Sequence, residues 1–419
     1  MQRFIGIIGI IVILAIAYLL STDRKKINFK TVGMGLLLQV SLAIFIFKVP
    51  IGQIIFLKIG KFIEKLLEFA IQGGQVVFSG LLEKPFESSF CHGAHVFTLQ
   101  LICSSIFMMI LVNILYYYGI MQKIVAILGK AMNKLMKVSG AEALCSVANS
   151  FVGQIVAQIM IKPYLKELTR SEMLTCMAGS MACISGAIMP IYIGMGIPAV
   201  YILASSVMAA PGVFVLTKIM YPEDDTPKTG ENIDITVEKT HVNVIDSISA
   251  GASDGMQVGI SVTAMIIALV ALVAMIDWML GGLGSFLYNN LHIGLAWLPT
   301  LSLKFILGKI FSIFAFVMGV PIHDITTVGG LMGEKIVLNE MVAYMDLTSI
   351  KHLLSEKAFL ISSFALCSFG NIGSIAIQIA GIGELAPEQR KNLAQLGVRA
   401  LICGTLTCYM SATIAGILF

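Results

Sequence analysis

The sequence predicts an all-α polytopic membrane protein in which each half of the chain carries a hairpin and a broken helix. Of the 419 residues, 57% are hydrophobic and 12% are charged, and the mean hydropathy is +0.91. A soluble domain carries about 25% charged residues. Several apolar segments are long enough to cross a bilayer, and others are interrupted by small and polar residues. The formal net charge of +4 does not indicate nucleic-acid binding.

The first predicted span is the apolar run of residues 5–20. Residues 21–23, which follow it, show no small-x-small cleavage pattern, so we expect a retained transmembrane helix rather than a signal peptide. Arg24, Lys25 and Lys26 come next. The positive-inside rule puts this basic loop in the cytoplasm and therefore the N-terminus outside.

Other segments are assigned by hydropathy and by periodicity. Residues 51–70 place Lys and Glu between large apolar side chains at three- and four-residue spacing, which is typical of an amphipathic helix in the membrane interface. A helix in a soluble loop is the alternative. Lysines between residues 123 and 137 mark a second surface helix. Further apolar segments occupy residues 32–47, 96–118, 200–220, 260–280, 295–320 and 399–419.

In the first half, residues 143–161 are apolar but interrupted by polar and small residues, and they are too few to cross the membrane twice. We expect a re-entrant hairpin, which a membrane tolerates only when it is buried in protein or lines a cavity. The next helix begins at Ser171-Glu172. We expect it to be broken at residues 183–186, which read Cys-Ile-Ser-Gly.

The second half repeats this pattern. Residues 329–344 are apolar but contain Asn339 and Glu340, and a helix that begins at Ser355-Glu356 is broken at residues 369–374. An acid at membrane depth costs about 2.5–3.5 kcal/mol, so we expect it to face a cavity or a substrate. Paired interrupted segments are the sequence signature of a secondary transporter's binding site. The alternative is that Gly and Ser only let helices pack closely.

These interrupted segments resemble the concentrative nucleoside transporter family. The similarity is carried by residues 338–344 (Leu-Asn-Glu-Met-Val-Ala-Tyr), 364–375, 411–416 and 319–321. It implies about eight transmembrane helices plus two re-entrant hairpins. It also implies a homotrimer in a bacterial inner membrane that imports nucleosides, coupled to a Na⁺ or H⁺ gradient, as one domain moves against the other like an elevator.

The resemblance also implies a division of the chain into a static scaffold and a mobile transport domain. The expected parts are scaffold and interfacial helices at 1–138, the first hairpin and broken helix at 139–220, a polar linker at 221–247, a long scaffold helix at 248–292, and the second hairpin, broken helix and final helix at 293–419. The two hairpin-containing parts form the transport domain.

In the family, an acid of the second hairpin and polar residues of the following helix break hold the ribose. Here these positions are Glu340, Asn371 and Ser374, with Phe369 lining the site. The chemistry suits a vicinal diol, because a carboxylate accepts hydrogen bonds, whereas an amide and a hydroxyl both donate and accept.

The first hairpin departs from the family pattern, Gly-Gln-Thr-Glu-x-Pro, whose side chains contact the nucleobase. Residues 153–158 here read Gly-Gln-Ile-Val-Ala-Gln, so Gln154 is kept while Ile155 and Val156 replace a hydroxyl and an acid. Ile188 takes another position that packs on the base. An apolar site discriminates between ligands only modestly.

The resemblance places the sodium ligands at the first hairpin and the next helix break. The expected set is the Asn149 side chain, the carbonyls of Val152 and Ile184, and a side chain at Cys183. A thiol is a poor ligand for a hard cation, which prefers oxygen. Ser185 is an alternative ligand if the backbone unwinds locally. We expect no other cofactor.

Three functional hypotheses follow. The first is a cation-coupled nucleoside importer. The second is the same fold carrying a non-standard or less polar riboside, since the first hairpin is apolar. The third is a non-transporting binding protein, or a chain trapped in one state. An enzyme is disfavoured because the histidines lie singly in loops or at helix ends. The expected partners are a nucleoside and the lipid bilayer, with no nucleic acid.

Overall fold

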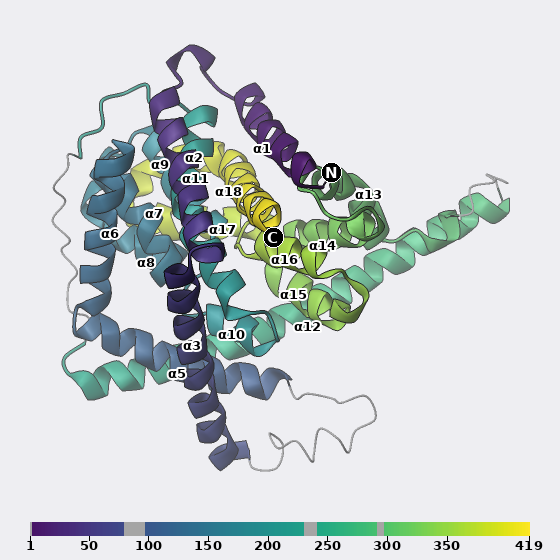
Figure 1. Cartoon of the computed structure of the whole chain (residues 1–419). Helices are drawn as coiled ribbons and strands as arrows, with labels where there is room; N and C mark the ends of the chain where they lie inside the picture. Colours follow the sequence, from purple (N-terminus) through teal and green to yellow (C-terminus); the bar gives the residue numbers. More distant parts are fainter. Residues whose placement is uncertain (1, 79–96, 230–240, 291–296) are drawn as a thin grey trace.

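The computed structural model describes residues 2–78, 97–229, 241–290 and 297–419, and within them it is all-helical, as predicted. Figure 1 shows the arrangement of the helices. The helices outside the hairpins and helix breaks are α1 (Gln2–Leu19), α2 (Phe29–Phe47), α3 (Pro50–Phe78), α5 (Phe97–Tyr117), α6 (Ile120–Met136), α11 (Ala199–Met220), α12 (Val244–Asn290), α13 (Leu303–Val317) and α18 (Arg390–Leu418).

The multi-span membrane character is confirmed. Among the described residues, five helices are long and apolar enough to cross a bilayer, and they lie in α2, α5, α11, α12 and α18. Two shorter apolar helices, Ile5–Leu19 and Ile372–Leu385, fall below that length. The second of these is one half of a broken helix.

The first half contains the expected hairpin and break. Helices α7 (Gly140–Val152) and α8 (Gln154–Met160) are joined by Gly153, whose φ of +89° favours glycine. Helix α9 (Arg170–Ala182) then ends in extended backbone, and α10 (Met189–Gly194) resumes beyond it. The start of α9 differs slightly from the prediction, because its N-cap is Thr169, in a capping box with Glu172, rather than Ser171.

The second half repeats this architecture with α14 (Ile325–Val337) and α15 (Glu340–Ser349) as the hairpin, followed by α16 (Glu356–Leu366) and α17 (Ile372–Leu385) as the broken helix. The polar interruptions are helix caps. Asn339 Oδ1 accepts a hydrogen bond from Val342 N at 3.0 Å at the start of α15. Asn371 Oδ1 accepts one from Ser374 N at 2.9 Å at the start of α17. Both interruptions therefore expose helix N-termini inside the fold.

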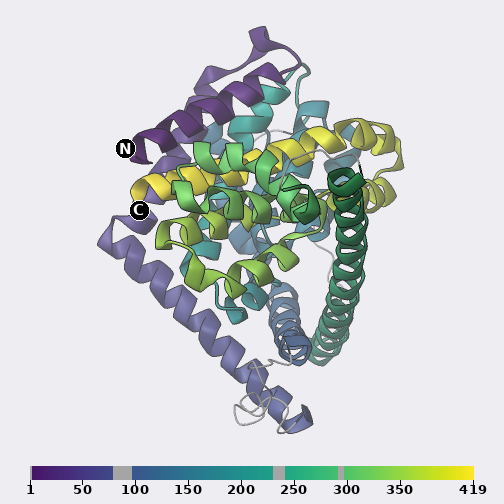
Figure 2. The ribbon, with the colours of Figure 1, turned by 90° about the vertical axis from the view of Figure 1, so that its right-hand side faces the viewer.

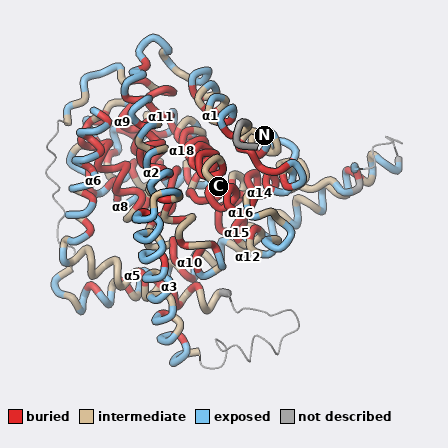
Figure 3. The backbone as a smooth tube through the Cα atoms, viewed as in Figure 1, coloured by how far each residue is buried: buried red, intermediate tan, exposed pale blue. Residues whose placement is uncertain are grey.

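The core lies around α9, α11 and α18, which are largely buried (Figure 3). Helix α9 packs against α18 and α11, and α16 packs against α18. Helices α1 and α2, which the sequence analysis groups with the scaffold, pack chiefly along α18 and α11. They therefore lie against the hairpin-containing parts.

Helix α12 extends beyond the hydropathic span of residues 260–280 at both ends, over about the range expected for the long scaffold helix at 248–292, and runs far past the rest of the chain (Figure 1). Its 47 residues extend about 70 Å at 1.5 Å per residue, more than twice the hydrocarbon thickness of a bilayer. It pairs with α5, and Figure 2 shows the two helices from a second direction. In isolation, this chain leaves the apolar span of α12 almost entirely uncovered.

Glycines set the close approach of α12 to α5. Gly251, Gly255 and Gly259 recur every four residues, the small-xxx-small pattern of membrane helix pairs. A Cβ on Gly255 would lie 2.4 Å from the Cα of Ile106 and 2.6 Å from the Ser105 carbonyl oxygen. Since these are backbone atoms, they cannot move aside without separating the helices.

We therefore expect Gly255→Leu to separate α12 from α5 and to lower the melting temperature in detergent by several degrees, because overpacking costs about 1–3 kcal/mol or more. Gly282→Leu, on the same helix, is the matched control, because a Cβ at Gly282 would have no packing neighbour among the described residues within 4 Å. Equal melting temperatures of the two variants would contradict this packing.

Candidate functional site

The two helix breaks lie against each other. Phe369 N, in the second break, donates to Cys183 O, in the first, at 3.3 Å. The Cys408 thiol of α18 donates to Ala182 O at 3.0 Å, at the end of α9. A Cβ on Gly370 would lie 3.0 Å from Met181 O, so the backbones meet closely. The broken helices of the two repeats thus form one junction.

Glu340 lies at this junction with one carboxylate oxygen unpaired. The residue is 6% exposed and is the first residue of α15. Its Oε1 accepts a hydrogen bond from Tyr192 OH at 2.8 Å, whereas its Oε2 is buried and has no hydrogen-bond partner among the described residues. The Asn371 side chain faces the same carboxylate. A buried acceptor without a partner is costly, so it indicates a place for a donor.

The structure brings the predicted sugar-side residues together. Asn371 Oδ1 accepts from the Ser374 backbone and also from Ser374 Oγ at 3.1 Å, and Ser374 Oγ lies in a short contact with Phe369 O. Because the Asn371 oxygen is used in capping, its NH₂ is the end left for the Glu340 side of the junction. Phe369 is partly exposed beside these groups.

Two residues at the junction were not predicted. Tyr192 comes from α10, in the first half, and its ring packs on Tyr344 of α15 at a centroid distance of 4.8 Å. Lys335 of α14 is fully buried, and its Nζ donates to Ala365 O at 3.2 Å, near the end of α16. Lys335 could have been noticed in the sequence by comparing the two hairpins. It lies about one helical turn before the interruption at Asn339, as Asn149 lies about one helical turn before Gly153. For Tyr192 the only local signal is the neighbouring Pro190.

On the first hairpin, the apolar replacements are partly open. Ile155 and Val156 are 41% and 37% exposed, and Ile155 packs against Gly381 of α17. Gln154 Oε1 accepts a hydrogen bond from Gln378 Nε2 of α17 at 3.1 Å. Ile188 is partly buried at the start of α10, against the cluster that contains Tyr192.

Gln158, which stands where the family pattern has proline, faces the core instead. It is fully buried, its Nε2 lies 3.4 Å from Ser180 Oγ, and its Oε1 accepts from the Cys145 thiol at 2.8 Å. Gln158 is therefore separated from the face that Ile155 and Val156 present.

The expected cation ligands belong to this hairpin and to the neighbouring helix break. Asn149 donates to Cys176 O at 3.4 Å, which leaves its buried Oδ1 without a partner among the described residues. The Cys183 thiol donates to Gly179 O at 3.2 Å and so serves its own helix. Ser185 is buried, and its Oγ lies 3.5 Å from where a Cβ of Gly153 would be. Amide and hydroxyl oxygens such as those of Asn149 and Ser185 are ligands that a hard cation prefers.

The described part of the chain contains no cluster of side chains that is typical of a transition-metal site. There, no group of three or more His, Cys, Asp and Glu side chains is placed to hold an ion. The described cysteines are free and buried, as is typical of cysteines that pack as small hydrophobic residues.

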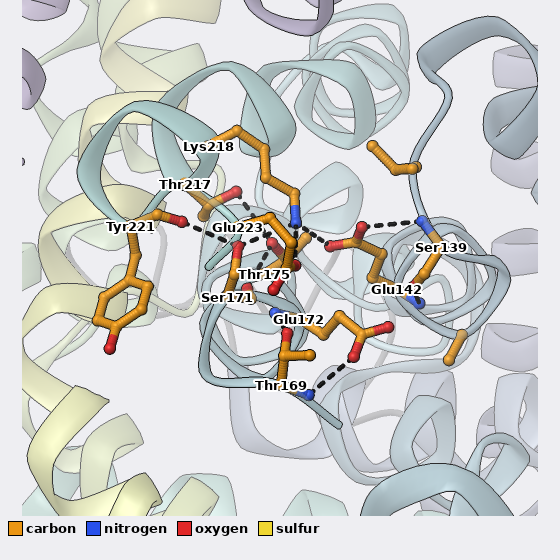
Figure 4. A network of polar contacts seen from close by, with 12 residues as sticks. Ser139, Glu142, Thr169, Ser171, Glu172, Thr175, Thr217, Lys218, Tyr221 and Glu223 are labelled. Carbon is orange, nitrogen blue, oxygen red and sulfur yellow. Dashed lines mark hydrogen bonds and ion pairs between the residues drawn. The ribbon is translucent and has the colours of Figure 1, made fainter. Parts of the chain in front are cut away.

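A buried ion-pair network lies at the base of the first hairpin (Figure 4). Lys218 Nζ, near the end of α11, lies 2.7 Å from Glu142 Oε2 and donates to Ser171 Oγ at 3.0 Å. Glu142 and Glu172 also cap the first turns of α7 and α9. The network therefore joins the starts of the hairpin and of the broken helix to α11. The sequence analysis did not predict it.

Comparisons with known proteins agree with this geometry. Models for the C-terminal and N-terminal parts of Na⁺ dependent nucleoside transporters match residues 201–416 and 8–81, and a nucleoside recognition gate model matches residues 98–199. A Haemophilus influenzae transporter, described as uncharacterized, is 38% identical, covering 98% of this chain and 97% of the relative. The nucleoside permease NupC of Helicobacter pylori is 35% identical, with coverage of 98% and 97%.

Solved structures match over the same length. CNTnw in an inward-facing substrate-bound state aligns with a TM-score of 0.90 at 37% identity, covering 99% of this chain and 98% of CNTnw. A CNTnw variant in an outward-facing state aligns with a TM-score of 0.92. The similarity covers both hairpins, both helix breaks and the rest of the fold. The chain therefore belongs to the concentrative, Na⁺-dependent nucleoside transporter family, whose members are membrane transporters rather than enzymes.

Proposed function

We propose that this protein is a secondary active transporter that imports nucleosides, driven by a cation gradient, with Na⁺ as the preferred ion. One observation carries the proposal. Glu340 is buried where the two helix breaks meet, and its Oε2 has no partner among the described residues. A ligand hydroxyl would satisfy this oxygen, and a riboside supplies adjacent hydroxyls.

The ribose is proposed to bind between the second hairpin and the second helix break. Glu340 accepts from a sugar hydroxyl, and the Asn371 NH₂ donates to one. Ser374 holds Asn371 in place, and Phe369 lines the pocket. A hydrogen bond to a charged group contributes about 1.5–3 kcal/mol, so the Glu340 contact dominates.

The base is proposed to lie toward the first hairpin, against Ile155, Val156 and Ile188, with Gln154 as the polar contact. An apolar surface separates similar bases by only about 10–200-fold. We therefore expect a broad choice of bases. A non-standard riboside remains the second candidate ligand, favoured by the exposed apolar side chains of Ile155 and Val156.

A single cation per protomer is proposed at the first hairpin, held by Asn149 Oδ1, the Val152 and Ile184 carbonyls, and Ser185. When bound, the ion would be coordinated by these oxygens and would tie the hairpin to the helix break. The second half differs at the corresponding place, where the amine of Lys335 already contacts Ala365 O. This asymmetry supports one ion site rather than two.

The proposed assembly is a homotrimer in a bacterial inner membrane, with the N-terminus outside. The basic loop after α1 supports the orientation. The uncovered apolar length of α12 supports a contact with other copies or with lipid. We propose that residues 139–220 and 293–419 move relative to a frame containing α5 and α12. The packing of α1 and α2 on α11 and α18 favours their moving with the bundle.

Uptake into liposomes tests the proposal. The purified protein should accumulate at least one ordinary nucleoside under an inward Na⁺ gradient, and less under K⁺ alone. Accumulation only under a proton gradient would show that H⁺, rather than Na⁺, is the coupling ion. Binding without accumulation would support a non-transporting or state-trapped protein. Thermal stabilisation by non-standard ribosides alone, and not by uridine or adenosine, would support the second candidate ligand.

A further inference from the structure

We infer that Gln378 of α17, together with Ser180 of α9, determines base specificity by fixing which end of the Gln154 amide faces the ligand. The inference rests on the proposed function, in which Gln154 contacts the base. It concerns residues that do not touch the base themselves. Their hydrogen bonds allow only one orientation of the amides.

The Ser180 hydroxyl has a single proton to donate. Ser180 Oγ lies 3.0 Å from both Cys176 O and Met177 O, and these carbonyls can only accept. The proton is therefore directed toward them, and the oxygen must act as an acceptor toward any other polar neighbour. Two side-chain amides are such neighbours, with Gln158 Nε2 at 3.4 Å and Gln378 Nε2 at 2.8 Å. Gln378 must present its NH₂ here, because a carbonyl oxygen could not donate.

The same NH₂ fixes the next amide. Gln378 Nε2 lies 3.1 Å from the Gln154 side chain. An amide nitrogen accepts no hydrogen bond, so Gln154 must present its carbonyl oxygen to Gln378. The Gln154 NH₂ is consequently the end left for a ligand. Ser180 and Gln378 are each 1% exposed, so water does not compete in this chain of bonds.

The first hairpin then offers the base a hydrogen-bond donor and no acceptor. The partly exposed neighbours, Ile155 and Val156, are aliphatic. Gln378 Oε1 also has no partner among the described residues, but Gln378 is 1% exposed and belongs to α17 rather than to the hairpin. A ring or carbonyl acceptor of the base would be satisfied by Gln154, whereas an N–H group facing this hairpin would be left unpaired at about 1–3 kcal/mol.

The inferred substrate class is therefore ribosides that present an acceptor edge to the hairpin. Ribosides whose ring N–H is replaced by an alkyl group should be accepted well, because the alkyl group meets the aliphatic side chains. 3-Methyluridine differs from uridine only in this group. We expect 3-methyluridine to compete for uptake at least as well as uridine does in the wild-type protein.

Gln378→Glu tests the orientation directly. A carboxylate only accepts, so Gln154 would turn its NH₂ toward residue 378 and present its oxygen to the base. The ratio of inhibition constants for uridine and 3-methyluridine should shift toward uridine by about tenfold, which corresponds to 1.4 kcal/mol. Gln395→Glu, the same change at an exposed contact of α18 with Arg170, should leave the ratio unchanged.

Ser180→Ala is a second variant. It removes the acceptor that orients Gln378, so the ratio of inhibition constants for uridine and 3-methyluridine should also shift toward uridine. An unchanged ratio in a transporting Gln378→Glu protein would overturn the inference and leave the proposed function intact. If Gln378→Glu fails to fold, an unchanged ratio in Ser180→Ala overturns it instead. A wild-type protein that neither transports nor binds any nucleoside would overturn both.

Discussion

Replacing Glu340 with glutamine should abolish nucleoside uptake while the protein still folds. The amide keeps the size of the side chain but has one acceptor oxygen instead of two. Tyr192 OH already donates to one carboxylate oxygen at 2.8 Å, so the glutamine would turn its NH₂ toward the ligand. An NH₂ cannot accept from the ribose hydroxyls. Each lost hydrogen bond to a charged group weakens binding by about 1.5–3 kcal/mol. Uptake into liposomes measures the effect.

Glu334→Gln is the matched control, because Glu334 lies on the same hairpin and its nearest cation is Lys304 Nζ at 3.8 Å. It should retain most of the wild-type uptake. Tyr192→Phe should have a smaller effect on uptake than Glu340→Gln, since it keeps the Glu340 carboxylate and removes only the hydroxyl that donates to it. We expect its apparent affinity to fall by about tenfold. Uptake by Glu340→Gln within threefold of the wild type would exclude Glu340 as the ribose contact.

Replacing Lys218 with methionine should lower the free energy of unfolding by about 3–5 kcal/mol, because one partner of a buried ion pair is removed. The side chains of Lys218 and Glu142 are 8% and 1% exposed. Without Lys218, the Glu142 carboxylate would remain buried near Glu172 with no cation to offset it (Figure 4). The starts of α7 and α9 should loosen first. Thermal and chemical unfolding in detergent measure the loss.

Lys26→Met makes the same change in an exposed pair. Lys26 and Asp224 are 52% and 40% exposed, and such pairs contribute about 0–1 kcal/mol. The double variant Lys218→Met, Glu142→Gln should recover part of the stability, since the glutamine carries no charge and can still accept from Ser139 N. If Lys218→Met and Lys26→Met were equally stable, the network would be peripheral to folding.

The positions of the hairpins and breaks were predictable because their signals are local. Asn339 and Asn371 interrupt apolar segments, and each caps the helix that follows it. Asn favours the N-cap position and also interrupts the apolar pattern, so the capping signal and the hydrophobic periodicity mark the same helix break. The predicted sugar-side residues share those breaks and therefore come together at the junction.

The remaining features depend on contacts between distant segments. Tyr192 meets Glu340 across 148 residues, and Gln154 meets Gln378 across 224 residues. No local pattern encodes such pairs. Hydropathy alone marks only residues 260–280 of α12, for a similar reason. Gly251 and Gly255 weaken a helix in isolation but here face α5, where their lack of a side chain permits close packing.

The central claim, that Glu340 and Asn371 recognise the ribose hydroxyls, is tested most directly by competition between ribosides and their 2′,3′-dideoxy analogues. The base is identical in each pair, so the first hairpin contributes equally. We predict that the dideoxy analogue competes at least 100-fold more weakly in the wild-type protein, since about 1.4 kcal/mol corresponds to tenfold and more than one hydrogen bond is lost. Equal competition by the two compounds would contradict it.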